Sequence, residues 1–142
     1  MTKTLLGTVV FFILSMTFIQ AQDYSLVGTW QGTKDGETGK FIFDKKGYAI
    51  MDQGGEKIGG KKYIAKGLKL KVIYDVNPTT DPKTIDFIIK KVDDDTEITR
   101  MVGIYKFVNE KTLVLNLNTT DKVRPRKFDP HGEDQIVLSK IR

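Results

Sequence analysis

The sequence predicts an all-β protein, a small antiparallel up-and-down β-barrel of about eight strands. Three observations support this fold class. Apolar and polar residues alternate with a period of two along most of the chain after residue 26, as half-buried antiparallel strands require. Short turn motifs separate the alternating runs. No stretch of that region shows the spacing of an amphipathic helix, so helices are not expected.

The clearest strand covers Lys69 to Tyr74, where Leu70, Val72 and Tyr74 share one face and lysines occupy the other. Similar alternation predicts seven further strands, at residues 27–33, 39–44, 48–52, 84–92, 98–107, 112–118 and 135–141. Eight short strands in sequence favour a closed barrel, because closure removes the exposed edges of a sheet. A sandwich of two sheets is the alternative.

Turn chemistry separates these strands. Asp35-Gly36 and the glycine in 45–47 suit tight hairpins, and two prolines exclude a central strand at 77–82. Residues 93–95 form a polar hairpin tip, and 119–134 form the longest irregular segment. The glycine-rich stretch 53–63 fits either a loop or a short irregular strand.

Residues 1–21 have the order of a signal peptide. A positive charge at Lys3 precedes an apolar run at 5–19, and the small Ala21 suits a cleavage site. The run is shorter than the ~20 residues that span a bilayer, although a retained membrane anchor is the alternative. We therefore expect a signal peptide at 1–21 and one domain at 22–142, with no integral membrane segment after cleavage. The expected location is secreted or periplasmic, in a bacterium.

The residues that usually carry chemistry are scarce. The chain has no cysteine and a single histidine, His131, in a turn-like context. The glycine and lysine pattern at 55–62 lacks the Ser or Thr of a phosphate-binding loop, and Asp93 to Asp95 lack the ligand spacing of a calcium loop. We expect no enzyme, no cofactor and no metal site. The net charge of +5 does not indicate nucleic-acid binding in an exported protein.

Gly28-Thr29-Trp30 opens the first predicted strand and resembles the lipocalin first-strand motif. Further pieces follow in order: Tyr74-Asp75-Val76, Gly103-Ile104-Tyr105, Arg124-Pro125 and Val137-Leu138-Ser139-Lys140. Together they resemble a bacterial lipocalin-like domain of exported proteins, across residues 26–142. The resemblance implies a small calycin barrel with no catalytic residues. It also implies structural roles for Gly28 and Trp30, with a basic side chain of the last strand, Lys140 or Arg142, over the tryptophan ring.

This interpretation predicts a monomer that binds a small, mainly hydrophobic molecule without covalent chemistry. The expected ligand-binding residues lie on the apolar sides of the strands: Phe41, Phe43, Tyr48, Leu70, Val72, Tyr74, Phe87 and Leu115. The alternative is a packed barrel that acts as an interaction or structural module of the cell envelope. Its basic outer surface would then contact an anionic partner, through Lys62, Lys66, Lys69, Lys71, Arg124 and Arg126.

Overall fold

A computed structural model describes residues 24–142, so the predicted signal peptide lies outside the described residues. These residues form ten β-strands, and no helix occurs among them. The described residues accordingly contain no helix long and apolar enough to cross a membrane. The strands are β1 Gly28–Lys34, β2 Glu37–Phe43, β3 Ala49–Gln53, β4 Glu56–Gly59, β5 Tyr63–Ala65, β6 Leu68–Asn77, β7 Lys83–Lys91, β8 Glu97–Asn109, β9 Thr112–Asn118 and β10 Gln135–Lys140.

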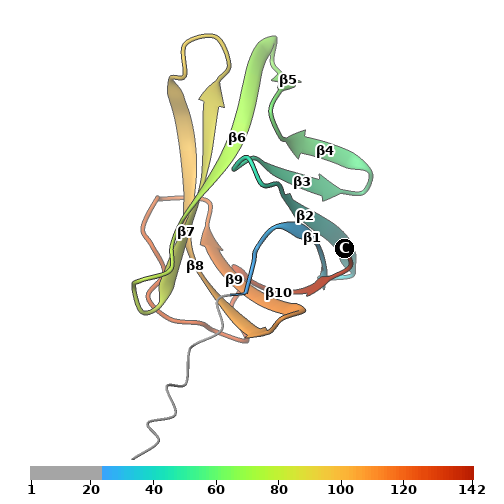
Figure 1. Cartoon of the computed structure of the whole chain (residues 1–142), viewed down its shortest axis with the longest axis vertical. Helices are drawn as coiled ribbons and strands as arrows, with labels where there is room; N and C mark the ends of the chain where they lie inside the picture. The colour runs from blue at the N-terminus through green and yellow to red at the C-terminus, as the bar shows by residue number, and fades with distance from the viewer. Residues whose placement is uncertain (1–23) are drawn as a thin grey trace, which may run out of the picture.

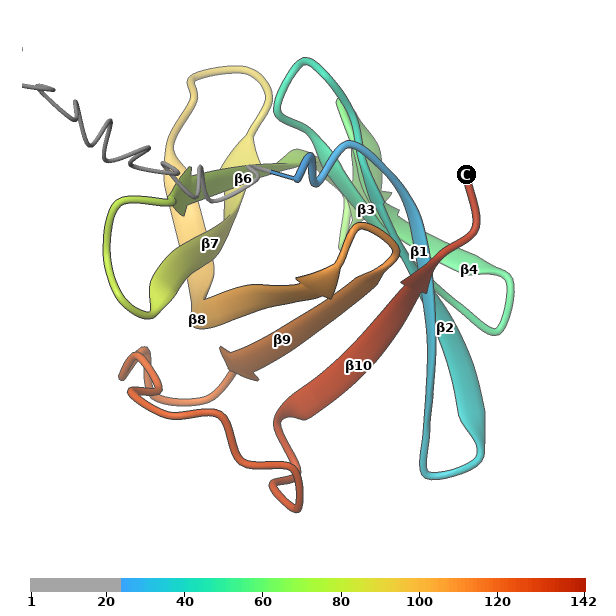
Figure 2. The same ribbon diagram turned by 60° about the horizontal axis from the view of Figure 1, so that its bottom comes forward.

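All ten strands belong to one antiparallel sheet with the order β4-β3-β2-β1-β10-β9-β8-β7-β6-β5. Each strand pairs with its neighbour in sequence, except that β4 does not pair with β5 and β1 pairs with β10. The sheet curls into a nearly closed barrel (Figures 1 and 2). Three backbone interactions join β6 to the region around β3 and so nearly close the barrel. They are the Tyr48–Ile73 bridge and two hydrogen bonds, from Val72 N–H to Gly60 O at 3.1 Å and from Tyr74 N–H to Gly47 O at 3.0 Å.

The all-β, barrel-like architecture agrees with the sequence prediction, but the strand count does not. Ten strands are present where about eight were expected, and the two additional strands are β4 and β5. Both are short and flank Gly59-Gly60, so neither carries enough alternation to be recognised from sequence. The single sheet also differs from the two-sheet sandwich that the sequence left open.

The up-and-down order separates the connections into two groups. The links β1–β2, β3–β4, β5–β6, β7–β8 and β9–β10 all follow odd-numbered strands and therefore belong to the same rim of the antiparallel sheet, which we call the hairpin end. The other links lie near the start of β1, which we call the Trp30 end. Tyr24 begins the described chain at the Trp30 end, where its ring meets the edge of Phe107 at 5.6 Å between centroids.

Side chains fill the interior towards the Trp30 end. The Phe87 ring on β7 lies 5.8 Å from Phe41 and 5.9 Å from Phe43, both on β2, between centroids. Strands β2 and β7 are not neighbours in the sheet, so these contacts cross the barrel. Phe43 also meets Tyr74 on β6 at 4.9 Å. The interior here is a packed aromatic core, as a barrel of this size permits.

Trp30 is fully buried in this core, with 0% of its surface exposed. Its indole N–H donates a hydrogen bond to the Leu26 carbonyl at 2.8 Å, and the ring of Phe107 lies 6.0 Å away. The Lys140 Nζ lies over the indole at 5.5 Å from the ring centroid. At Gly28, φ is +142°, and a Cβ would lie 2.5 Å from the Arg142 carbonyl oxygen. Only glycine fits there without displacing the C-terminal residues.

A carboxylate on the outer wall fastens the irregular 119–134 segment to the barrel. Asp86 is 8% exposed and accepts hydrogen bonds from Arg124 at 2.7 Å and from Arg100 at 3.0 Å. The same Arg124 nitrogen donates to the Gly103 carbonyl at 2.8 Å. The Asn116 side-chain amide adds a bond to the Lys127 carbonyl at 2.8 Å. These bonds compensate the desolvated carboxylate and hold the long segment against β7, β8 and β9.

Candidate functional site

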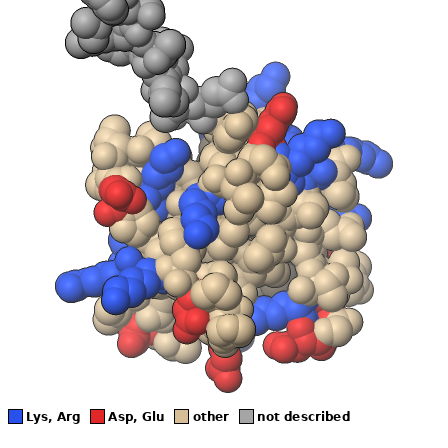
Figure 3. Space-filling model, turned by 90° about the horizontal axis from the view of Figure 1, so that it is seen from below, with Lys and Arg blue, Asp and Glu red and all other residues tan. Residues whose placement is uncertain are grey.

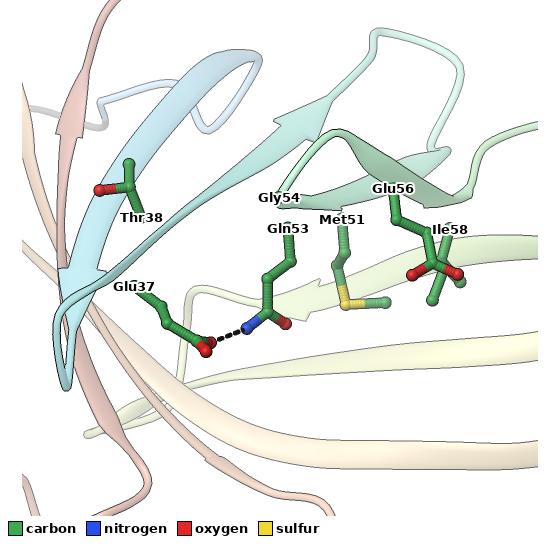
Figure 4. A pocket seen from close by; sticks show the side chains of 7 residues that line it. All are labelled: Glu37, Thr38, Met51, Gln53, Gly54, Glu56 and Ile58. Atoms are coloured by element: carbon green, nitrogen blue, oxygen red, sulfur yellow. Dashed lines mark hydrogen bonds between the residues drawn. The ribbon is translucent and has the colours of Figure 1, made fainter.

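A pocket of about 590 Å³ lies at the hairpin end of the barrel, on the inner side of β2, β3 and β4. Figure 4 shows the side chains of Glu37 on β2, Met51 and Gln53 on β3, and Glu56 and Ile58 on β4 directed towards the same space, whereas Thr38 points away from it. The lining residues are Glu37, Thr38, Met51, Gln53, Gly54, Glu56 and Ile58.

Strand register explains why these side chains meet. Met51 lies opposite Phe41 on β2 and opposite Ile58 on β4, so the three residues share one face of the sheet. Phe41 packs against the hydrophobic core, which identifies that face as the interior. Gln53 and Glu56 face each other one pleat nearer the hairpin end. The pocket therefore continues the inner wall of the barrel beyond its packed core.

A smaller pocket of about 270 Å³ shares Glu37, Met51 and Gln53 with the first. It extends towards β1 and β10 and adds Phe41 and Ile136 as further apolar groups. We call the two pockets together the cup. Its apolar surface comes from Phe41, Met51, Ile58 and Ile136, and its polar surface from Lys34, Glu37, Thr38, Gln53 and Glu56. Lys40 and Asp52, which lie opposite each other and alternate to the outer face, also border the smaller pocket.

Carboxylates and an amide form the polar side of the cup. Gln53 Nε2 donates a hydrogen bond to Glu37 Oε2 at 2.5 Å. Lys34 lies opposite Glu37 in the sheet, but its ammonium donates to the carbonyls of Gln135 at 2.9 Å and Gly132 at 3.4 Å. Neither Glu37 nor Glu56 forms an ion pair with any of residues 24–142. The polar side of the cup is therefore rich in hydrogen-bond acceptors.

The two tyrosines of β5 and β6 that pack against the core stay neutral. Burial raises the pKa of Tyr63, and burial followed by the charge of Asp44 raises the pKa of Tyr74. The Tyr74 hydroxyl donates to the Asp44 carbonyl at 2.8 Å. Among residues 24–142, no group of three or more His, Asp or Glu side chains could hold a metal ion. The cup can hold a molecule by apolar contact and hydrogen bonds.

The eight residues expected to line a ligand cavity occupy different positions. Four of them belong to the solid core and are at most 1% exposed: Phe43, Val72, Phe87 and Leu115. Leu70 is 7% exposed, and Tyr74 packs against the core from its edge. Of the eight, Phe41 alone contributes to the cup. The predicted ligand residues thus mainly fill the interior beneath the cup.

Tyr48 does not share the inner face with the other seven. It lies opposite Ile73, whose neighbour Val72 points into the core, and its own neighbour Ala49 is fully buried. Successive side chains of a strand point to opposite faces, so Tyr48 is on the outside. The sequence prediction has Tyr48 as the first inward-pointing residue of a strand at 48–52. In the structure, the first inward-pointing residue is Ala49, so Tyr48 points outward.

Sequence reasoning missed most of the residues that line the cup. Ile58, Glu56 and Gln53 fall in the glycine-rich stretch 53–63, which predicted no defined strand. The available signal is weak: Glu56 and Ile58 alternate with the outward Lys57, but the pattern ends after four residues. Met51 lies within a predicted strand, but an inward phase that begins at Tyr48 places Met51 on the outer face, so the prediction does not include it.

Other hollows lie on the outside of the barrel or at the Trp30 end. A groove of about 490 Å³ separates Pro82 and Ile104 from Val123 and Pro125 of the long segment. Two hollows of about 390 Å³ and 290 Å³ share Tyr24, Tyr105 and Phe107 at the Trp30 end. Both border the start of the described chain, so the cup is the hollow best defined by strands alone.

Comparison of this chain with protein-family models, with curated proteins and with solved structures found no match.

Proposed function

We propose that this protein is an exported, lipocalin-like binding protein that holds a small, mainly apolar molecule in the cup without covalent chemistry. One observation carries the proposal: the inner wall leaves an open pocket of about 590 Å³ at the hairpin end of the barrel, next to the packed aromatic core. This volume lies within the ~300–1,000 Å³ typical of small-molecule sites. Met51 and Ile58 supply apolar contact, and a few polar groups supply orientation.

The packed core limits the length of the ligand. Rings of Phe41, Phe43 and Phe87 meet across the barrel below the cup, so a long chain has no path towards the Trp30 end. The ligand is therefore compact, with its apolar part on Met51 and Ile58. Its polar part is a hydrogen-bond donor, because Glu37 and Glu56 offer acceptors and have no cationic partner among residues 24–142.

The lipocalin-like part of the proposal rests on the first strand. The buried Trp30, the close approach at Gly28 and the position of Lys140 over the indole are the features that the family resemblance implies. Export rests on the amino-acid order of residues 1–21. N-terminal sequencing of the mature protein tests this part, with Gln22 expected as the first residue within a few positions.

The cup is tested with a neutral apolar fluorophore, N-phenyl-1-naphthylamine, titrated against the mature protein. We expect emission to rise on binding, and Ile58→Trp to weaken binding at least about tenfold by filling the pocket. The matched control is Val137→Trp, which adds the same side chain at a 54% exposed site on the outward face of β10, opposite the face that borders the cup. Equal probe binding by Ile58→Trp and Val137→Trp, both folded by circular dichroism, would refute the cup as the site.

The second candidate function is an interaction or structural module of the cell envelope, with a packed barrel. The rings that meet across the interior favour it. The exterior is not uniformly basic on the face seen from below, because Figure 3 shows acidic side chains interspersed with lysine and arginine there. Absence of probe uptake by the folded wild-type protein, together with no ligand in native mass spectrometry, would select this second function.

A further inference from the structure

The tip of the β5–β6 hairpin combines positive charge with exposed apolar side chains. Ile64 is 61% exposed and Leu68 is 44% exposed. Lys62, Lys66 and Lys69 are all exposed. We call these five residues the hairpin patch. The hairpin reaches the top of the molecule in the view of Figure 1, beside β7 and β8.

Backbone geometry holds the patch together. Ala65 pairs with Leu68, so Lys66-Gly67 form a two-residue turn, and their φ values of 48° and 75° fit a type I′ hairpin. Ile64 lies directly opposite Lys69 and shares its outward face, whereas Leu68 lies beside the turn on the other face of the hairpin, together with Leu70. Lys62 precedes Ile64 by two positions and has the same orientation by strand alternation. The patch thus spans only a few residues of a tight hairpin, roughly 10–15 Å at ~3.3 Å per residue.

The charges of the patch are not neutralised within the described part of the chain. None of Lys62, Lys66 and Lys69 forms an ion pair with any of residues 24–142. By contrast, Asp95 lies 2.5 Å from Lys71 and 3.7 Å from Lys90, next to the patch. The acidic β7–β8 turn therefore takes up the neighbouring lysines and leaves those of the patch open to an external anion.

Edge protection alone does not explain this composition. β5 is an edge strand, and lysines on edge strands discourage pairing with another chain. That role does not require Ile64 or Leu68 at the surface, where large exposed apolar groups between charges usually mark an interaction site. An anionic lipid surface accommodates both components, since its headgroups attract lysine and its acyl boundary accepts Ile and Leu.

We propose that the hairpin patch docks this protein on an anionic lipid bilayer. Lys62, Lys66 and Lys69 contact the headgroups, and Ile64 and Leu68 enter the interface. Asp93 and Asp94 on the adjacent turn are exposed and carry the opposite charge, so the contact is confined to the β5–β6 side of the hairpin end. The inference concerns the tip of the β5–β6 hairpin and does not depend on ligand binding in the cup.

The test is co-sedimentation of the mature protein with vesicles of phosphatidylcholine containing one quarter phosphatidylglycerol, compared with phosphatidylcholine alone. We expect binding to the anionic vesicles that weakens at high salt, because salt screens exposed charges. Each lysine contributes ~fivefold to affinity, so Lys62→Gln with Lys66→Gln and Lys69→Gln should weaken binding about 100-fold. Equal binding to both vesicle types, or wild-type affinity in the triple variant, would overturn the proposal.

A matched triple variant controls for net charge. Lys45→Gln, Lys46→Gln and Lys111→Gln remove the same charge at exposed turn positions of the Trp30 end, and should change vesicle affinity less than about twofold. Both triple variants should keep N-phenyl-1-naphthylamine binding, whereas Ile58→Trp should keep vesicle binding. Failure of the docking proposal is thereby distinguished from failure of the cup.

The apolar part of the patch separates a bilayer from a soluble polyanion. In an Ile64→Trp variant, the emission of the new tryptophan should shift to shorter wavelength with anionic vesicles, because the side chain leaves water. Ile64→Ser should weaken vesicle binding several-fold and leave binding to dextran sulfate unchanged. Tight binding to dextran sulfate, with no emission shift on vesicles, would replace the lipid proposal with an acidic polymer as the partner.

Discussion

Replacing Trp30 with alanine should lower the free energy of unfolding by ~3–5 kcal/mol, the usual range for a large buried aromatic residue. The structure places this substitution at the upper part of the range. The ring is 0% exposed and packs against Phe107. Its indole N–H bonds to the Leu26 carbonyl, and the Lys140 ammonium lies over its face. A domain of this size has only ~5–15 kcal/mol of stability, so the loss is a large fraction of the total.

Smaller substitutions divide this effect into parts. Trp30→Phe retains an apolar ring but removes the indole N–H, which leaves the Leu26 carbonyl without its donor and should cost ~1–3 kcal/mol. Lys140→Met retains most of the aliphatic side chain and removes the cation over the indole, with an expected loss of ~0.5–1 kcal/mol. The expected order of destabilisation is therefore Trp30→Ala, then Trp30→Phe, then Lys140→Met.

Urea denaturation followed by far-ultraviolet circular dichroism is the appropriate assay. Trp30 is the only tryptophan, so its fluorescence is lost in two of the three variants. In the wild-type protein, the same fluorescence should report a buried indole by emission at short wavelength. A loss below ~1 kcal/mol in a folded Trp30→Ala variant, or wild-type emission typical of water, would refute the assignment of Trp30 to the core.

Three further predictions concern the wall and the charges. Asp86→Ala should cost ~1–3 kcal/mol in urea denaturation and increase proteolysis of the 119–134 segment, because two arginines lose their common carboxylate. Gly103→Ala should destabilise by ~1–3 kcal/mol, since its Cβ would lie 2.5 Å from a backbone oxygen, whereas Gly39→Ala, at 3.4 Å, should change the unfolding midpoint little. The hydrogen bond and charge of Lys71 lower the pKa of Asp95 from its ordinary 3.8, so the stability that Asp95 contributes is present above that pH and lost as pH falls through the lower folded value. Urea titrations at several pH values should show this loss below about pH 4, and a smaller loss in Asp95→Asn.

Local alternation was sufficient to predict most of the barrel. Leu70 and Val72 alternate with lysines because one face of β6 meets the core and the other meets water. This alternation is visible in the amino-acid sequence. Turn residues added the boundaries, as at Asp35-Gly36 between β1 and β2. The structural role of Trp30 was instead implied by the resemblance of Gly28-Thr29-Trp30 to the lipocalin first-strand motif.

The cup was not predictable from sequence, because it depends on pairings between residues distant along the chain. β4 has four residues and acquires its orientation from β3, where Met51 lies opposite Ile58. Nothing local shows that Glu56 and Ile58 face inwards, since glycines flank the strand on both sides. Tyr48 illustrates the same limit, because an error of one residue in phase moves a side chain to the other face.

The amino-acid sequence by itself determined the all-β class, the up-and-down order and the inward faces of the long strands, because these follow from periodicities of two and from turn chemistry. Tertiary structure decided how much of the interior is solid. Phe41 and Phe43 meet Phe87 only because curvature brings β2 and β7 together across the barrel. Whether inward side chains touch or leave a hollow depends on that curvature and on side-chain volumes from opposite walls, and no single strand contains this information.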